Sequence, residues 1–286
     1  MQEENSTRRA RQRNREDESF LPVIIKRNDQ ATRHPDDILE RAIHEGIDQH
    51  RKSNFSLFLS AVAAGLILGF AAMCVALATQ LVPADKYGEL VNRLALAIVY
   101  PLGFIICVMS GTQLFTEQTA TAVYPVLDRK ASKRSLLKLW SLVLAGNFVG
   151  SFASSFLLFL ADDVITASEG FIQIADHLTH FSAPQIFVSA ILAGWLMAQG
   201  GWLIMSTPPA SSQVICIYIV TFIIGLGGLH HSIVGSAEIF SGLLHSPTPN
   251  YLGSIKFIIS AVLGNLTGGV VFVGVLNYGH IRKTQK

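Results

Sequence analysis

Residues 225–240 read "GLGGLHHSIVGSAEIF" and interrupt the apolar run "VICIYIVTFII" (214–224), which would otherwise continue as a membrane-spanning helix. The stretch holds four glycines and two adjacent histidines. A second interruption, "SGTQLFTEQT" (110–119), falls inside the apolar segment 92–127. Backbone groups freed by a break inside a bilayer are tolerated only where protein buries them or where they line a wet cavity. The two breaks therefore predict a structured site within a membrane protein.

The composition supports this prediction and excludes other classes. The 286 residues are 50% hydrophobic, with a mean hydropathy of +0.42, and only 15% are charged, whereas a soluble domain has about 25%. The three cysteines all lie in apolar runs and have no metal-ligand spacing, so we expect no disulfide framework and no metal. The net charge of +2 gives no indication of nucleic-acid binding.

Six apolar segments are long enough to span a bilayer, and the cations around them predict their orientation. Of the 22 Lys and Arg residues, 19 lie in 1–54, in 128–138 and in the C-terminal "HIRKTQK", while the loop 162–184 has none. This distribution places both termini in the cytoplasm of a bacterial-type inner membrane. The segments are 55–79, about 92–127, 137–161, 185–206, 212–244 and 255–278.

The chain divides into three parts. Residues 1–35 are charged and poor in aromatics, which predicts a disordered tail. Residues 36–54 predict an amphipathic cytoplasmic helix, lying either on the membrane surface or on the body of the protein. Residues 55–286 predict a six-span channel domain.

The two broken spans belong to an internal repeat. Each is followed by a span carrying G-N-x-x-G, "GNFVG" (146–150) and "GNLTG" (264–268). Thr112 precedes Asn147 by 35 residues, and His231 precedes Asn265 by 34. Three spans per unit give the two units opposite membrane orientations, and such inverted repeats point to a transport site near the midplane. The glycine pairs predict close helix packing.

The breaks and the spans after them supply the candidate site residues. Ionisable groups inside a span are functional candidates, and an amide there stabilises freed backbone groups. The candidates lining the pore or binding the solute are His231, Thr116, Leu114, Phe115, His230 and Ser232. Those supplying vestibule charge are Glu117 and Glu238, and those supporting the breaks are Asn147 and Asn265.

At these residues the sequence resembles the formate/nitrite transporter family. The matching motifs are "SGTQLFTEQ", "HHSIVG", "GNFVG" and "GNLTGG", and the resemblance covers roughly 36–280. It implies an aquaporin-like fold, a homopentamer with one pore per protomer, and passage of small monovalent weak acids or their anions. By motif position His231 resembles the central pore histidine, Thr116 the hydrogen-bonding loop threonine, and Leu114 and Phe115 the constriction. The long charged head is typical of the YfdC-type branch.

Four departures from the family pattern bear on the solute. Gln113 stands where the family usually has an acid, and Glu117 where it has a small residue. Gly235 stands where the family often has an asparagine, and Leu178 where it commonly has a lysine. Losing a cation and placing Glu117 and Glu238 beside the breaks makes the vestibules less favourable to anions.

These features predict a pore, without enzymatic activity or cofactor, in which His231 relays a proton to the solute. One alternative is the same fold passing a neutral or cationic solute selected by Glu117 and Glu238, which we expect at similar places in the two repeats. Another is an intramembrane metalloenzyme using His230, His231 and Glu238, although adjacent helical residues point about 100° apart. A third is a non-conducting scaffold whose basic head recruits a partner.

Overall fold

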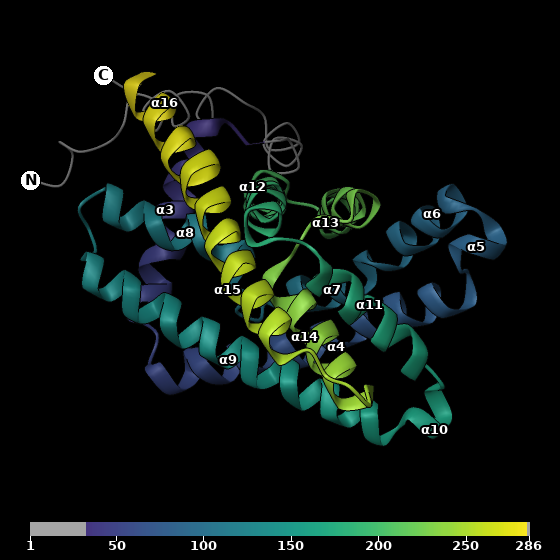
Figure 1. The fold of residues 1–286 in the computed structure, drawn as a ribbon. Coiled ribbons are helices and arrows are strands. Elements are labelled where there is room, and N and C mark those ends of the chain that lie inside the picture. The colour runs from purple at the N-terminus through teal and green to yellow at the C-terminus, as the bar shows by residue number, and fades with distance from the viewer. Residues whose placement is uncertain (1–32, 285–286) are drawn as a thin grey trace, which may run out of the picture.

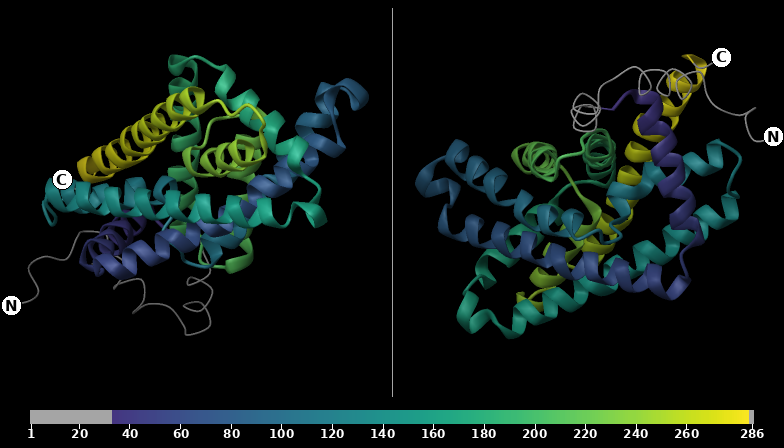
Figure 2. Two further views of the ribbon diagram at one scale, coloured as in Figure 1. Left: turned by 60° about the horizontal axis from the view of Figure 1, so that its bottom comes forward. Right: turned by 180° about the vertical axis from the view of Figure 1, so that it is seen from behind.

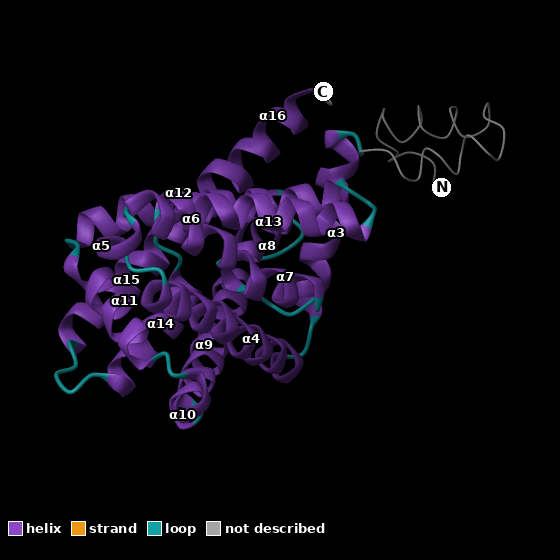
Figure 3. Ribbon diagram, turned by 90° about the vertical axis from the view of Figure 1, so that its right-hand side faces the viewer, coloured by secondary structure: helices purple, strands orange, loops and turns teal. Residues whose placement is uncertain are grey.

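The protein is helical along residues 33–284, which the computed structural model describes, and short loops connect the helices (Figure 3). Six helical segments in that range are long and apolar enough to span a membrane: α4, α6 with α7, α9, α12, α13, and α15 through to α16. The predicted all-α, six-span membrane protein is therefore confirmed. The predicted tail lies almost wholly outside the described residues. The longer helices are α3 (Pro35–Arg51), α4 (Asn54–Leu81), α6 (Glu89–Val99), α7 (Pro101–Met109), α8 (Phe115–Leu127), α9 (Lys133–Leu160), α11 (Ser168–His180), α12 (Ala183–Ser206), α13 (Ala210–Gly227), α14 (Ser232–His245), α15 (Tyr251–Thr267), the π-helix η1 (Gly268–Val275) and α16 (Leu276–Thr284).

The long helices pack in two close pairs, α4 with α9 and α12 with α15 (Figure 1). A Cβ atom at Gly150 would overlap the carbonyl oxygen of Val62, and one at Gly268 would overlap that of Ile191. The predicted close packing at these glycines is therefore confirmed. The two contacts occupy equivalent places in the two halves of the chain. Val62 and Ile191 are 129 residues apart, as Ser60 and Ser189 are, and Gly150 and Gly268 are 118 apart, as Asn147 and Asn265 are.

Two spans are interrupted and restart after a short loop. Five residues separate α7 from α8, and four separate α13 from α14. Gly111 and Gly228 lie in these loops with φ angles of 67° and 57°, a region that glycine enters without steric cost. The first loop is shorter than the predicted interruption at 110–119, because residues 115–119 already form the first turns of α8.

The segment 162–184, predicted as a loop, is instead mostly helical. It contains the short α10 (Asp162–Ile165) and the longer α11, which packs against α4 and α14. The Phe171 side chain is fully buried, and a Cβ atom at Gly170 would overlap the carbonyl oxygen of Ala76. The segment carries too few apolar residues to span a bilayer, but enough to pack on the helices beneath it.

Helix α3 packs its apolar face onto the body of the protein. Ile38, Leu39, Ala42 and Ile43 are buried in a cluster that includes residues of α8, α12 and α16. Of the two predicted positions for this amphipathic helix, the structure therefore favours packing on the body. Helices α3 and α16 lie at the same end of the molecule (Figure 2).

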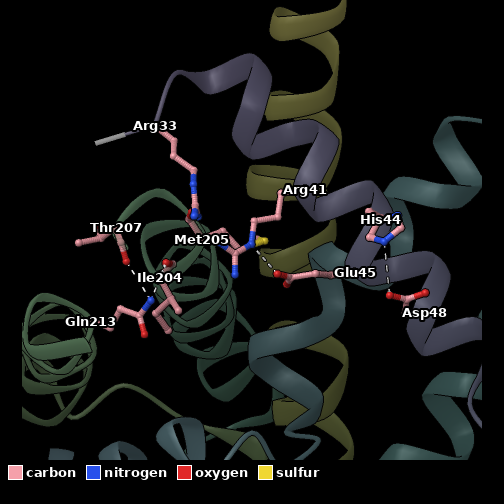
Figure 4. A network of polar contacts seen from close by, with 9 residues as sticks. All are labelled: Arg33, Arg41, His44, Glu45, Asp48, Ile204, Met205, Thr207 and Gln213. Atoms are coloured by element: carbon pink, nitrogen blue, oxygen red, sulfur yellow. Dashed lines mark hydrogen bonds and ion pairs between the residues drawn. The ribbon is translucent and has the colours of Figure 1, made fainter. Parts of the chain in front are cut away.

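Polar contacts fix the start of α3 to the end of α12 (Figure 4). The Arg33 amide donates to the carbonyl oxygen of Ser206 at 3.0 Å, and its guanidinium donates to that of Met205 at 2.6 Å. Gln213 donates from its side chain to the Thr207 carbonyl oxygen at 2.9 Å, which closes the turn into α13. Arg33 thus fixes the start of α3 to the last residues of the fourth span.

The sixth span changes helix type along its length. After Thr267 the α-helix becomes the π-helix η1, which packs against α8 and α12. The Tyr124 hydroxyl of α8 donates to the Val273 carbonyl oxygen of η1 at 3.2 Å. Beyond it, α16 brings Tyr278 and Arg282 to the Asp128 carboxylate, at 3.1 and 2.9 Å. The C-terminal helix is therefore fixed to the end of α8.

Candidate functional site

Asn147 holds the first break together from the third span. Its side-chain oxygen accepts the amide of Phe115, the first residue of α8, at 2.9 Å. Its side-chain nitrogen donates to the carbonyl oxygens of Gln113, in the loop, and Ala61, in α4, at 2.9 and 2.8 Å. Ser60 adds a fourth contact by accepting the Gln113 amide at 3.2 Å. One buried amide thus satisfies three backbone groups at and beside the break.

Asn265 makes the same set of contacts at the second break. It accepts the amide of Ser232, the first residue of α14, at 2.7 Å. It donates to the carbonyl oxygens of His230 and Ala190 at 3.0 and 2.7 Å, while Ser189 accepts the His230 amide at 3.2 Å. Each contact matches one at the first break, so the two halves support their breaks in the same way.

Thr116 and His231 bring the two halves into contact at a buried point. The Thr116 hydroxyl oxygen lies 2.6 Å from Nε2 of His231, and both side chains are at most 1% exposed. Nδ1 of His231 accepts the backbone N–H of Val234 at 3.2 Å. Because Nδ1 is an acceptor, the proton of the neutral ring sits on Nε2 and is donated to Thr116. The edge of the ring meets Phe104, with centroids 5.0 Å apart.

The contacts correct the alignment of the two breaks. Counting from the amides that Asn147 and Asn265 accept, His231 corresponds to Leu114 and not to Thr112. Thr112 instead donates its hydroxyl to the Cys107 carbonyl oxygen at 2.8 Å, at the end of α7. His231 caps its own helix through Val234, whereas the apolar Leu114 provides no side-chain cap for α8. The two half-helices therefore begin differently.

The remaining candidates around the breaks are buried in different surroundings. Leu114 and Phe115 are 0% and 3% exposed in the main core, and Ser232 begins α14. The His230 ring lies between Phe181 and Phe257, with centroids 5.2 and 5.6 Å away. Within the described residues its ring nitrogens have no hydrogen-bond partner. The two adjacent histidines thus face different neighbours.

Glu117 and Glu238 do not occupy equivalent positions, contrary to the sequence-based comparison. Glu117 is the third residue of α8, beside Gly201 of α12, whereas Glu238 is the seventh residue of α14 and 5% exposed. Neither carboxylate has a hydrogen bond or an ion pair to any residue in 33–284. Only Glu117 lies in the first turn, where a carboxylate benefits from the positive end of a helix dipole.

Among the described residues, no group of three or more His, Cys, Asp and Glu side chains is arranged to hold a metal ion. His230, His231 and Glu238 are accordingly not brought together as a ligand set.

Sequence reasoning missed several residues that the structure places near the breaks. Ser60 and Ser189 belong to the matching motifs "SAVAAG" (60–65) and "SAILAG" (189–194), so the repeat contained a signal for them. Lys256 of α15 donates to the Thr179 carbonyl oxygen at 2.9 Å, next to Leu178. A cation therefore does lie at this end of α11, supplied by a different helix. No spacing in the sequence indicated this contact.

The chain has six membrane spans, and each half contributes one half-helix to the buried contact between Thr116 and His231. This arrangement is typical of membrane transport proteins. The family model described as formate/nitrite transporter matches residues 36–279. The chain therefore belongs to the formate/nitrite transporter family.

Individual relatives agree with this assignment. The inner membrane protein YfdC of Escherichia coli (strain K12) is 30% identical over 256 residues, which cover 84% of this chain and 78% of the relative. A solved structure titled "FNT family ion channel" superposes with a TM-score of 0.76 at 20% identity, covering 86% and 98% of the two chains. A pentameric formate channel with formate bound gives a TM-score of 0.70 at 22% identity, covering 80% and 98%. The structural likenesses establish the fold.

Proposed function

We propose that the chain passes small monovalent weak acids, or their anions, across a membrane at the contact between Thr116 and His231. That contact carries the proposal because both half-helices begin there. A helix N-terminus presents free N–H groups and a partial positive charge, a combination that suits a small anion. The Nε2–H of His231 and the Thr116 hydroxyl supply hydrogen bonds that can turn from each other to a solute oxygen.

The surroundings of this contact favour passage of the solute in its neutral form. Phe104 packs against the His231 ring, and Leu114 and Phe115, which directly precede Thr116, are buried in the same apolar core. An unpaired charge in such a site is costly. An anion that loses its water there gains a proton more readily. Proton transfer is the only chemistry this requires, so the proposed activity is transport and not catalysis. As in the hypothesis drawn from the sequence, we assign to His231 the relay of this proton to the solute.

We propose the assembly and the orientation from separate observations. Formation of a homopentamer is proposed by analogy with the pentameric formate channel. Apolar side chains such as Phe55, Leu90 and Leu252 are 73%, 69% and 81% exposed, which is suitable for contact with lipid or with neighbouring protomers. The Lys and Arg distribution supports cytoplasmic termini, in an inner membrane as for the YfdC relative.

Uptake of labelled formate into proteoliposomes tests the function. We expect wild-type protein to pass formate and His231→Phe to lose most of the flux while the oligomer survives, because the substitution removes the hydrogen-bonding ring at the constriction. His44→Phe, on the outer face of α3 with its side chain 78% exposed, is the matched control. Wild-type flux in His231→Phe would contradict a role for this ring in transport.

A neutral or cationic solute is the second candidate, favoured by the carboxylates of Glu117 and Glu238, which have no partner in the described chain. Liposome swelling over a panel of anionic, neutral and cationic solutes separates the two proposals. Preference for neutral or cationic solutes, lost in Glu117→Gln and Glu238→Gln, would favour the second.

A further inference from the structure

Three titratable residues recur at intervals of seven from the N-cap of α14 to its last residue: His231, Glu238 and His245. Seven residues of an α-helix turn through about 700°, so the three positions lie on nearly one face, with about 10.5 Å between successive residues. The Glu238 residue is 5% exposed, and the His245 side chain is 3% exposed. This face therefore carries a buried line of ionisable groups from the site to the far end of α14.

The far end of the line reaches the surface at Asp162. Nε2 of His245 lies 3.8 Å from the Asp162 carboxylate, which is 22% exposed and also accepts the Ala167 amide at 2.9 Å. The His245 ring packs against Phe159 and Phe171, with centroids 5.1 and 5.2 Å away. Its Nδ1 lies 2.7 Å from the carbonyl oxygen of Ser241, to which a protonated nitrogen donates. Nε2 then remains available to take a proton from the Asp162 side.

Ser241 lies between Glu238 and His245 along α14. It is three residues after Glu238 and four before His245, and helical residues at these spacings are neighbours. Its hydroxyl is fully buried and has no hydrogen-bond partner among residues 33–284. A hydroxyl can accept a hydrogen bond on one side and donate on the other. An unpartnered hydroxyl at this position is suited to pass a proton along the line.

At the inner end, Glu238 is freer than His231 to exchange protons. Both nitrogens of His231 are engaged, one with Val234 and one with Thr116. Glu238 has no hydrogen bond or ion pair to any residue in 33–284. We propose that Asp162, His245, Ser241 and Glu238 form a proton path that loads Glu238, which then protonates the anion on its way to His231.

The proposed transfer conserves protons and charge. The protonated Glu238 carboxyl gives its proton to the arriving carboxylate, so the neutral acid moves on and Glu238 becomes a carboxylate. Ser241 then donates its hydroxyl proton to Glu238 and receives one from Nδ1 of the His245 imidazolium, whose N–H turns to the hydroxyl from the Ser241 carbonyl oxygen. His245 returns to the neutral form and takes its next proton from water at Asp162. This inference rests on the proposed passage of weak acids.

Full-length protein in liposomes that contain a pH-sensitive dye tests the path, with labelled formate as the probe. We expect Glu238→Gln to slow coupled formate and proton uptake on the order of 100-fold, the scale of general acid catalysis, because the amide cannot exchange a proton. Ser241→Ala and His245→Gln should lose a smaller part. Ser236→Ala is the matched control, because its hydroxyl donates to the Ser232 carbonyl oxygen at 2.6 Å and lies off the line.

Formamide, a neutral solute of the same shape as formic acid, distinguishes proton supply from pore structure. We expect every variant to pass formamide as the wild type does. Normal formate uptake in Glu238→Gln would overturn the path and leave the proposed function standing. Loss of formamide together with formate in Glu238→Gln would also overturn it, because Glu238 would then act in pore structure or solute selection and not in proton supply. A wild-type protein that passes no formate would instead contradict the proposed function itself.

Discussion

The Thr116 hydroxyl oxygen lies 2.6 Å from Nε2 of His231, although the two residues are 115 positions apart in the chain. Each belongs to the first turn or the cap of a half-helix from a different half of the protein. The contact therefore forms only when both breaks are correctly placed, so a change in either half is expected to alter it.

Replacing Thr116 by valine should destabilise the protein measurably. The substitution preserves shape but leaves the Nε2–H of His231 without its acceptor in a buried site, at a cost of about 1–3 kcal/mol. The free energy of unfolding in detergent is the measurement. Thr267→Val is the control, since Thr267 is only partly buried and its hydroxyl donates within its own helix, to the Leu263 carbonyl oxygen. Equal stability of the two variants would show that the contact contributes little.

Truncating either asparagine should prevent accumulation of folded protein. Asn147→Ala and Asn265→Ala each leave three buried backbone groups unpaired, at about 1–3 kcal/mol per group. The yield of monodisperse protein and its melting temperature measure the effect. Asn92→Ala, which removes a single bond to Val82 at 2.7 Å, should be tolerated. A normal yield of Asn147→Ala would mean that other groups support the break.

Adding a methyl group at the helix crossings should separate the helices. In Gly150→Ala and Gly268→Ala the new Cβ overlaps a backbone oxygen, which cannot move without displacing its helix. Both variants should melt at lower temperature than the wild type. Gly279→Ala in α16, where the space is open, should be neutral or stabilising by about 0.5–1 kcal/mol. The opposite order of melting temperatures would argue against close packing at these glycines.

The C-terminal helix should loosen in acid through Asp128. Partial burial raises the pKa of the Asp128 carboxyl, but the Lys130 hydrogen bond and the Arg282 and Lys130 charges outweigh it, so its pKa lies below the usual value. A lowered pKa means that stability is present above the unfolded-state pKa and is lost as pH falls through the folded-state value. Wild-type protein should therefore lose stability in acid relative to Asp128→Asn.

Thermal unfolding of the wild type and Asp128→Asn, followed from pH 6 down to about pH 2, measures this difference, because that range passes through and below the ordinary aspartate pKa of about 4. The exposed Asp163→Asn is the control and should follow the wild type. Parallel pH curves for the wild type and Asp128→Asn would contradict a stabilising role of the carboxylate.

The spans and the breaks could be predicted from the sequence because they follow from local composition. Apolar runs of sufficient length define the six spans, and glycine with polar residues marks both loops. The packing of α3 on the body was one of two predictions left open, because an amphipathic face fits a membrane surface as well as a protein surface. The helical character of 168–180 was missed because so few of its residues are apolar.

The pairing of residues at the site was harder to predict than the residues themselves. His231 was compared with Thr112 by counting the residues to the following asparagine. The structure pairs Phe115 with Asn147 and Ser232 with Asn265, so the number of residues from each half-helix to its asparagine is 32 in the first half and 33 in the second. Glu117 and Glu238 were taken as equivalent for a related reason, although they lie four residues apart along the matched half-helices. The Lys256 contact joins residues 77 positions apart, and a single sequence contains no signal for such a pair.

The π-helix η1 has no counterpart in the first half, since α9 continues as an ordinary α-helix beyond Gly150. A π-helix has a wider turn than an α-helix, so side chains beyond η1 point in other directions than their counterparts in α9. In the first half, Tyr124 donates to the Val273 carbonyl oxygen of η1, and Asp128 accepts from Tyr278 of α16. The two copies have therefore ceased to be interchangeable parts: a chimaera built by exchanging their third helices would leave α8 without its carbonyl partner and the chain end without its anchor.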